Sequence, residues 1–215
     1  MEQSKYPNNF GELPDGNSGY KDSKVVILPF PYEKTTCYGK GTEKGPEAII
    51  KASSEMELYD EENGNVHECG ICTLKDLKID KNPEQMAEIA CNHVKSLLKD
   101  DKFVVTLGGE HSITSPIVKA FREKYNDLAV LQIDAHADLR EEFEGSKHSH
   151  ACAMRRTIEI CPVVQVGIRS LSGEEADFIK QRKLRIFWAK DIVDNDKWFD
   201  EAIKMLPKNV YITFD

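Results

Sequence analysis

The sequence predicts an α/β fold built around a mainly parallel β-sheet. Short apolar runs rich in β-branched residues alternate with longer amphipathic stretches along the 215 residues. This is the order expected when strands alternate with crossover helices. The runs are almost continuously apolar, which is typical of strands buried on both faces of a sheet. Because no internal repeat and no Pro/Gly/Ser-rich linker interrupts this pattern, we expect a single domain over residues 1–215.

The apolar runs are the expected strands of this sheet. Each is four to six residues long, and two of them, KFVVTL and LAVLQI, end directly before polar clusters. In chain order, the expected strands are Lys24–Leu28, Lys102–Leu107, Leu128–Ile133, Val163–Val166, Leu184–Phe187 and Val210–Phe214.

The stretches between the runs have the spacing of amphipathic helices. Pro83–Leu98 repeats apolar residues every three or four positions, and proline is well suited to the first turn of a helix. Ser172 followed by Glu175 is the pattern of a capping box, so we expect a helix to begin there. The other expected helices are Pro46–Met56, Ile113–Tyr125, Gly173–Gln181, Asn195–Leu206 and one that starts near Ala151.

Composition excludes several classes of function. The formal net charge of -8 disfavours a nucleic-acid partner, whose phosphates need basic patches, and is compatible with a cationic substrate. No stretch approaches the roughly 20 apolar residues of a membrane span. The N-terminus, MEQSKYPNNFGELPDG, lacks the apolar core of a signal peptide. We therefore expect a cytosolic protein that does not associate with membranes.

The six cysteines are too sparse for a disulfide scaffold. Cys69 and Cys72 form a C-x-x-C beside His67, which admits a redox pair or half of a zinc site. A structural zinc ion normally takes four ligands, and the sequence holds no second C-x-x-C. The simpler interpretation, two reduced cysteines in or near a strand, is favoured.

Polar clusters follow three of the expected strands. Gly108–Ser112 (GGEHS) follows KFVVTL, Asp134–Asp138 (DAHAD) follows LAVLQI, and Asp215 follows VYITF. Ligands of open parallel sheets bind beyond the carboxyl ends of the strands. The three clusters can therefore converge on one site.

The strongest of these signals is the alternation of Asp134, His136 and Asp138. In an extended chain, residues two apart face the same side, so two carboxylates and an imidazole would crowd together. A divalent cation relieves the resulting repulsion. The alternative is an ordinary polar turn that leaves a buried strand, which explains the alternation less well.

Three histidines near these clusters have weaker signals. In GGEHS the glycines permit a sharp turn that brings His111 to the same crevice, although a plain turn with Ser112 capping the next helix explains the motif too. His148 and His150 lie in a polar loop, where histidines are usually solvated. Because the imidazole pKa lies near neutrality, one of the two could shuttle protons.

Several longer motifs resemble the ureohydrolase superfamily of arginase, agmatinase and their relatives. The segment after the first expected strand, Leu28–Ile49, resembles the corresponding family loop. The other matching motifs are GGEHSIT (Gly108–Thr114), DAHADLR (Asp134–Arg140), SHACAMRR (Ser149–Arg156) and VQVGIRS (Val164–Ser170).

The resemblance implies a three-layer α/β/α sandwich and a centre with two Mn²⁺ ions. His111, Asp134, Asp138 and Asp215 would hold one ion. His136 would hold the other, with Asp134 and Asp215 as bridges. Carboxylate-rich ligation with one histidine per ion also suits a hard ion such as Mn²⁺.

The resemblance also implies catalytic roles and an assembly. Asp138 would orient the nucleophile, and His150 matches the proton-shuttling histidine of the family. His148 has no such counterpart and is expected to be a surface residue. Family members form trimers or hexamers, so a homo-oligomer is expected.

Agmatine is the expected substrate, with urea and putrescine as products. Guanidinobutyrase, arginase and formiminoglutamase share the metal motifs and remain alternatives, although Glu141–His150 shows no arginase-type loop for an α-carboxylate. A non-catalytic relative and a single-zinc deacetylase of related fold are further alternatives. His111 and Asp138 favour two metals over one.

The resemblance departs from the family at Asp215. There the family continues into an Asp-x-Asp-x-x-Asp-Pro motif, whereas the sequence ends at the first aspartate. We therefore expect a longer natural chain, whose continuation supplies the remaining carboxylate ligand of the second metal.

Overall fold

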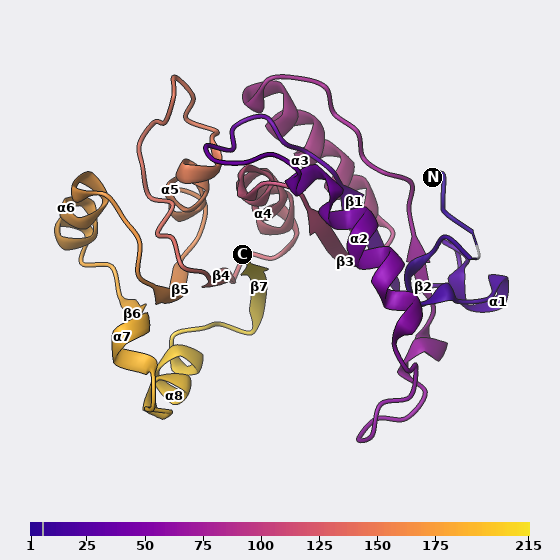
Figure 1. The fold of residues 1–215 in the computed structure, drawn as a ribbon. Helices are drawn as coiled ribbons and strands as arrows, with labels where there is room; N and C mark the ends of the chain where they lie inside the picture. The colour runs from indigo at the N-terminus through magenta and orange to yellow at the C-terminus, as the bar shows by residue number, and fades with distance from the viewer. Residues whose placement is uncertain (6) are drawn as a thin grey trace. The chain divides into compact units, whose positions relative to one another are not determined.

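The computed structural model describes residues 1–5 and 7–215, which form two compact units (Figure 1). The first unit comprises Met1–Asp80 and His93–Glu110, and the second comprises Lys81–Asn92 and His111–Asp215. Helix α3 (Pro83–Lys99) contributes residues to both. The expectation of a single domain stays a prediction.

The first unit is built on a three-stranded parallel sheet with the order β2-β1-β3. Its strands are β1 (Val25–Phe30), β2 (Ile71–Thr73) and β3 (Phe103–Gly108). The central strand β1 is the most buried of them, as expected for a strand paired on both sides. The helical segments of this unit are η1 (Phe10–Glu12), α1 (Asp15–Ser18), η2 (Thr42–Lys44), α2 (Gly45–Ala52), η3 (Ser53–Glu55) and η4 (Val66–Cys69).

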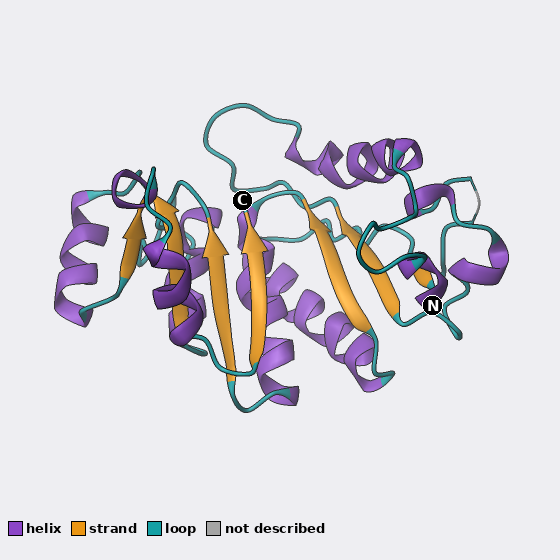
Figure 2. Ribbon diagram, turned by 90° about the horizontal axis from the view of Figure 1, so that it is seen from below, coloured by secondary structure: helices purple, strands orange, loops and turns teal. Residues whose placement is uncertain are grey.

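The second unit contains a four-stranded parallel sheet with the order β6-β5-β4-β7 (Figure 2). Its strands are β4 (Leu128–Ile133), β5 (Val163–Ile168), β6 (Ile186–Trp188) and β7 (Asn209–Phe214). Its helical segments are η5 (His111–Ile113), α4 (Thr114–Lys124), η6 (His150–Cys152), α5 (Ala153–Ile158), α6 (Gly173–Arg182), α7 (Ala189–Ile192) and α8 (Lys197–Lys204).

Helices pack on both faces of this four-stranded sheet. Val130 of β4 packs with Val118 of α4 in one apolar cluster. Val164 and Val166 of β5 pack with Ala202 of α8 in another. Val130 pairs with Val163, the neighbour of Val164 in β5, and neighbouring residues of a strand point to opposite faces, so the two clusters lie on opposite sides of the sheet. The predicted α/β fold with a parallel sheet is confirmed.

The predicted elements are present, with shifted ends. The capping box at Ser172 is confirmed, since its hydroxyl accepts from the Glu175 N–H and its own N–H donates to the Glu175 carboxylate. The strand expected at Leu184–Phe187 begins instead at Ile186. Lys183 takes a left-handed conformation that ends α6, and the Leu184 N–H bonds back to Ile179, so neither residue is free to join the sheet.

The C-x-x-C motif follows the simpler interpretation. Cys69 ends η4, Cys72 lies buried in β2, and both are free thiols. Burial raises the pKa of the Cys72 thiol. Because the thiolate is the form that reacts and binds metal, this environment disfavours both a redox role and a zinc role.

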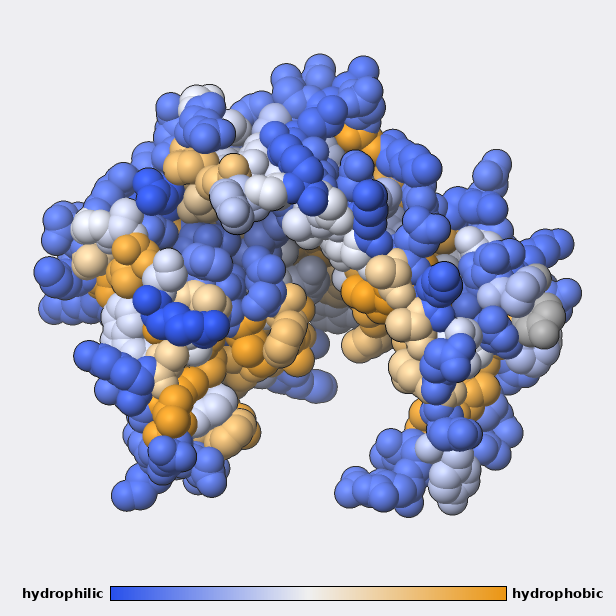
Figure 3. Space-filling model, in the orientation of Figure 1, coloured by the Kyte–Doolittle hydropathy of each residue, from blue (hydrophilic) through white to orange (hydrophobic). Residues whose placement is uncertain are grey.

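Strand β7 leaves part of one sheet face uncovered. Ile212 and Phe214 are 61% and 80% exposed, whereas Thr213 between them is buried. Figure 3 shows orange, apolar surface where β7 and α8 lie in Figure 1.

Among the residues that the structure describes, no helix is long and apolar enough to cross a membrane.

The glycine turn after β3 depends on a close approach between two backbones. Gly109 donates its N–H to Phe30, and Glu110 donates to Tyr32. A Cβ atom on Gly109 would lie 2.2 Å from the Tyr32 carbonyl oxygen. The buried Glu110 carboxylate then accepts hydrogen bonds from the N–H groups of Lys34 and Thr35. Only glycine fits at position 109.

We predict that Gly109→Ala lowers the free energy of unfolding by about 1–3 kcal/mol, because the added methyl group forces the two backbones apart. Urea denaturation measures the change. Gly173→Ala is the matched control, since a Cβ atom there meets nothing within 4 Å at the start of α6. Equal stability of the two variants would contradict the close-approach argument.

Candidate metal centre

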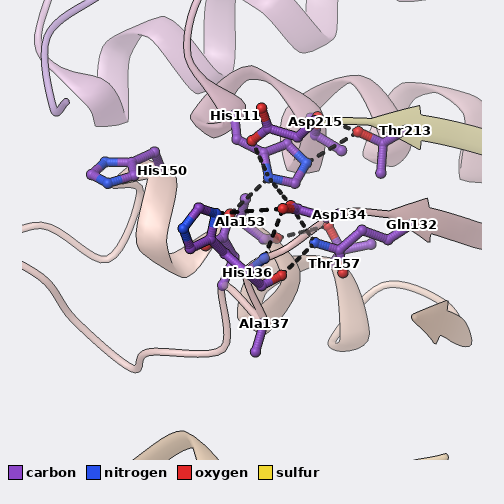
Figure 4. Close-up of polar contacts among 12 residues, drawn as sticks. His111, Gln132, Asp134, His136, Ala137, His150, Ala153, Thr157, Thr213 and Asp215 are labelled. Carbon is purple, nitrogen blue, oxygen red and sulfur yellow. Dashed lines mark hydrogen bonds and ion pairs between the residues drawn. The ribbon is translucent and has the colours of Figure 1, made fainter. Parts of the chain in front are cut away.

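Four side chains with metal-ligand chemistry converge within the second unit. They come from η5, from the segment after β4 and from the end of β7, and each offers one ligand atom (Figure 4). These atoms all lie within 4.8 Å of one another. The residues are His111, Asp134, Asp138 and Asp215. We call them the four-residue cluster; three are buried, and the Asp215 side chain is 53% exposed.

The sheet register places two of the carboxylates. Strands β4 and β7 are parallel neighbours, and Ile133 pairs with Phe214. Asp134 and Asp215 therefore follow their strands at the same level. The Asp215 N–H donates to the Ile133 carbonyl at 3.0 Å, and the Asp134 N–H donates to Val166 of β5 at 3.0 Å. Sheet hydrogen bonding thus fixes the backbone at both aspartates.

The DAHAD segment turns sharply after β4, so the expectation of an extended, one-sided alternation is wrong. The Asp134 carboxylate accepts the His136 N–H at 2.8 Å, which bends the chain as an Asx-turn. Asp138 then adopts a left-handed φ of 51°. Its carbonyl accepts the N–H groups of Met154 and Arg155, at the start of α5. Asp138 is brought back to Asp134 by this turn.

The same turn leaves His136 outside the four-residue cluster. Its side chain is 62% exposed, and its Nδ1 atom lies 3.5 Å from Asp134 Oδ1. The structure therefore places His136 beside the cluster, in contact with one of its carboxylates. Its predicted role as a ligand of a second metal stays a prediction.

His111 faces all three carboxylates. Its Nδ1 atom lies 2.7 Å from Asp138 Oδ2 and 3.5 Å from the Oδ2 atoms of both Asp134 and Asp215. Its Nε2 atom lies 3.0 Å from the Thr213 hydroxyl. Burial alone lowers the pKa of His111, but the hydrogen bond to Asp138 and the three negative charges outweigh it and raise the pKa.

The crowding of carboxylates is costly without a cation. Burial raises the pKa of Asp134, and the charge of Asp138 raises it further, although hydrogen bonds from the His136 N–H and the Gln132 amide oppose the shift. Three carboxylates and one imidazole form a donor set that suits hard or borderline divalent ions. The residues present therefore fit a divalent metal ion.

The two loop histidines differ from each other. His150 begins η6 and packs edge-to-face against the Phe143 ring, with centroids 5.7 Å apart. Figure 4 shows it to one side of the cluster, on the same side as His136. The expectation that His148 is a surface residue is wrong, because it is half-buried and burial lowers its pKa. Among the described residues, none bonds its Nδ1 atom.

Three polar residues around the cluster were missed by the sequence analysis. Gln132 of β4 and Thr213 of β7 contact cluster side chains, and Gln165 of β5 contacts Gln132. Gln132 and Thr213 lie near the carboxyl ends of their strands, and Gln165 lies in the middle of the mainly apolar β5. A polar residue within such a strand is the signal that could have identified them.

Comparison with known proteins agrees with these observations. The chain is 41% identical to N(1)-aminopropylagmatine ureohydrolase of Synechocystis sp., over 97% of this chain and 74% of that protein. It is 34% identical to an agmatinase of Halalkalibacterium halodurans, over 92% of this chain and 69% of that protein. The solved agmatine ureohydrolase of Thermoplasma volcanium superposes with a TM-score of 0.86 at 29% identity, covering 97% of this chain and 71% of that one.

A model of the family described as "Arginase family" matches residues 23–215, which include every residue of the four-residue cluster. Enzymes of this family are hydrolases that act on amidines and typically depend on two metal ions, as the sequence motifs predicted. The match, the relatives and the fold lead to one assignment: the chain belongs to the Arginase family.

Proposed function

We propose that the protein is a manganese-dependent ureohydrolase that cleaves the guanidinium group of agmatine to release urea and putrescine. The observation that carries this proposal is the convergence of His111 and three aspartates within 4.8 Å. Such a cluster provides the negative field and the oxygen-rich ligands that divalent cations require.

His111, Asp134, Asp138 and Asp215 would hold one Mn²⁺ ion. His136 would contribute to a second, shared through Asp134 and Asp215. Its position beside Asp134 Oδ1 supports this assignment. When bound there, divalent ions would supply a nucleophile at neutral pH, because they lower the pKa of water.

The chain's own residues would carry the remaining steps. The Asp138 carboxylate, already a hydrogen-bond acceptor from His111, would orient the nucleophile. The planar cationic guanidinium would be attracted by the carboxylate-rich site. When the carbon–nitrogen bond to the amine breaks, the leaving nitrogen needs a proton, and His150 would supply it.

A second substrate is favoured by one specific observation. The relative from Synechocystis, at 41% identity, is named for N(1)-aminopropylagmatine. This compound and agmatine share the guanidinium group and differ at the other end, so the same metal centre would serve either.

We further propose a cytosolic trimer or hexamer, as the family resemblance implies.

We predict that His111→Ala removes manganese binding and urea release together, because it takes away the nitrogen ligand that faces all three carboxylates. His136→Ala should instead lower the manganese content from two ions per chain to one. Equilibrium dialysis with metal analysis measures both. His67→Ala, a histidine outside the cluster, is the control.

Two results would count against this assignment. Unchanged manganese content and turnover in His136→Ala would remove that residue from the site. One ion or none in the unaltered protein would favour the alternative of a non-catalytic relative.

We predict that His150→Asn lowers kcat by about 10²- to 10⁴-fold, the range that general acid catalysis supplies. Manganese affinity should not change, because His150 lies to the side of the cluster. Urea release under saturating substrate, with metal content measured in parallel, separates the two effects. His148→Asn is the matched control in the same loop, and an equal loss in that variant would argue against a specific shuttle.

We predict that agmatine or N(1)-aminopropylagmatine is hydrolysed with the highest kcat/KM in a panel that also contains arginine, guanidinobutyrate and formiminoglutamate. The amine-ended substrates bring no carboxylate into an already acidic site. Urea or formamide release is the measurement. Preference for a carboxylate-bearing substrate would contradict the proposal.

A further inference from the structure

Two glutamines lie side by side beneath the four-residue cluster. Gln132 of β4 and Gln165 of β5 are paired in the sheet register, so their side chains point to the same face. They are 0% and 1% exposed. Polar side chains buried this deeply in an apolar sheet are costly unless they are hydrogen-bonded. Two buried glutamines at paired positions therefore indicate a specific role.

The two amides form a continuous path to Asp134. The Gln165 side-chain NH₂ donates to the Ala137 carbonyl at 2.8 Å and, through a short hydrogen bond, to the Gln132 side-chain oxygen. The Gln132 NH₂ donates to Asp134 Oδ2 at 2.8 Å and to the His136 carbonyl at 3.1 Å. Figure 4 shows Gln132 directed at Asp134, with Ala137 below.

The chemistry of the end groups fixes the direction of this path. The Ala137 carbonyl can only accept, so Gln165 must present its NH₂ group. That group also faces Gln132, which must therefore present its oxygen. The remaining NH₂ of Gln132 is then directed at Asp134, which as a carboxylate can only accept. Reversing either amide would set two acceptors against each other.

This path determines how Asp134 is held. Its Oδ2 atom accepts from Gln132, and its Oδ1 atom accepts from the His136 N–H. With one hydrogen bond on each oxygen, the plane of the carboxylate is fixed, and each oxygen keeps a lone pair for a cation. Groups that orient a ligating carboxylate in this way commonly control metal affinity.

We propose that Gln132 and Gln165 act as a relay of positioning residues, in which Gln165 sets the orientation of Gln132 and Gln132 sets the orientation of Asp134 for metal binding. The proposal rests on the metal-binding function proposed above. It assigns a role to two residues outside the four-residue cluster. The proposal predicts that Gln165 affects metal affinity through Gln132, whose side-chain oxygen accepts its hydrogen bond.

Methionine substitutions test this dependence, because methionine fills a similar volume without donating a hydrogen bond. The variants are Gln132→Met, Gln165→Met and the double variant. Manganese affinity is measured by titration, with free Mn²⁺ followed by electron paramagnetic resonance. Gln132→Met should weaken affinity roughly 10- to 100-fold, the effect usual for an orienting partner. Gln165→Met should weaken it less.

The double variant gives the decisive comparison. If Gln165 acts through Gln132, adding Gln165→Met to Gln132→Met should cause no further loss of affinity, since coupled residues are not additive. The spectrum of bound Mn²⁺ should change in the same way in Gln132→Met and the double variant. Additive losses would overturn the relay.

Thr157→Val controls for a general loss of packing. Thr157 is fully buried in α5, and its hydroxyl donates to the Ala153 carbonyl rather than to the cluster. This variant should lower the melting temperature and leave manganese affinity unchanged. An affinity loss equal to that of Gln132→Met would overturn the proposal.

The titration of the unaltered protein separates the two proposals. If the unaltered protein binds manganese and Gln132→Met binds it with the same affinity, the relay is overturned and the proposed function is not. An unaltered protein that binds no manganese would overturn the proposed function and the relay with it.

Discussion

Mutual repulsion among three buried or half-buried carboxylates is the constraint on which this site depends. Asp134, Asp138 and Asp215 approach one another around a single imidazole, His111. Gathering like charges in a partly desolvated place opposes folding. Burial and, to a smaller extent, the charge of Asp138 raise the pKa of Asp134, and the three carboxylates raise the pKa of His111. A divalent cation would relieve this repulsion, which requires a scaffold that holds the four side chains in place.

The sheet of the second unit provides that rigidity. Parallel pairing of β4 with β7 sets Asp134 and Asp215 at one level, and helices pack on both faces of the sheet, although one face of β7 stays exposed. Asp138, by contrast, is placed by a turn whose left-handed backbone is held by the first turn of α5. The cluster thus combines ligands fixed by strand register with one fixed by loop geometry.

Buried polar groups extend the site into the sheet. Thr213 lies beside the far nitrogen of His111, and the two glutamines connect Asp134 to the backbone of its own loop. In water these hydrogen bonds would contribute little, but inside an apolar sheet an unpaired amide is expensive. Burial therefore allows the hydrogen bonds of these amides to hold neighbouring side chains in a defined orientation. It also explains why polar residues are tolerated in strands that are otherwise apolar.

The sequence by itself determined the parallel α/β fold and the strand ends at which the polar clusters lie. These follow from local patterns, because apolar runs must be buried and ionisable groups at strand ends must be neutralised. The choice of the four cluster residues came from the resemblance of the longer motifs to the ureohydrolase superfamily. The orientation of His136, the left-handed turn at Asp138 and the shortened strand after Lys183 were decided only in the tertiary structure. The turn at Asp138 depends on the N–H groups of Met154 and Arg155, which sequence spacing does not specify. The other two depend on local hydrogen bonds, from His136 to Asp134 and from Leu184 to Ile179, whose geometry the residue pattern did not reveal. The pairing of Gln132 with Gln165 likewise exists only once β4 and β5 lie in register, because residues 33 positions apart share a face only through the sheet.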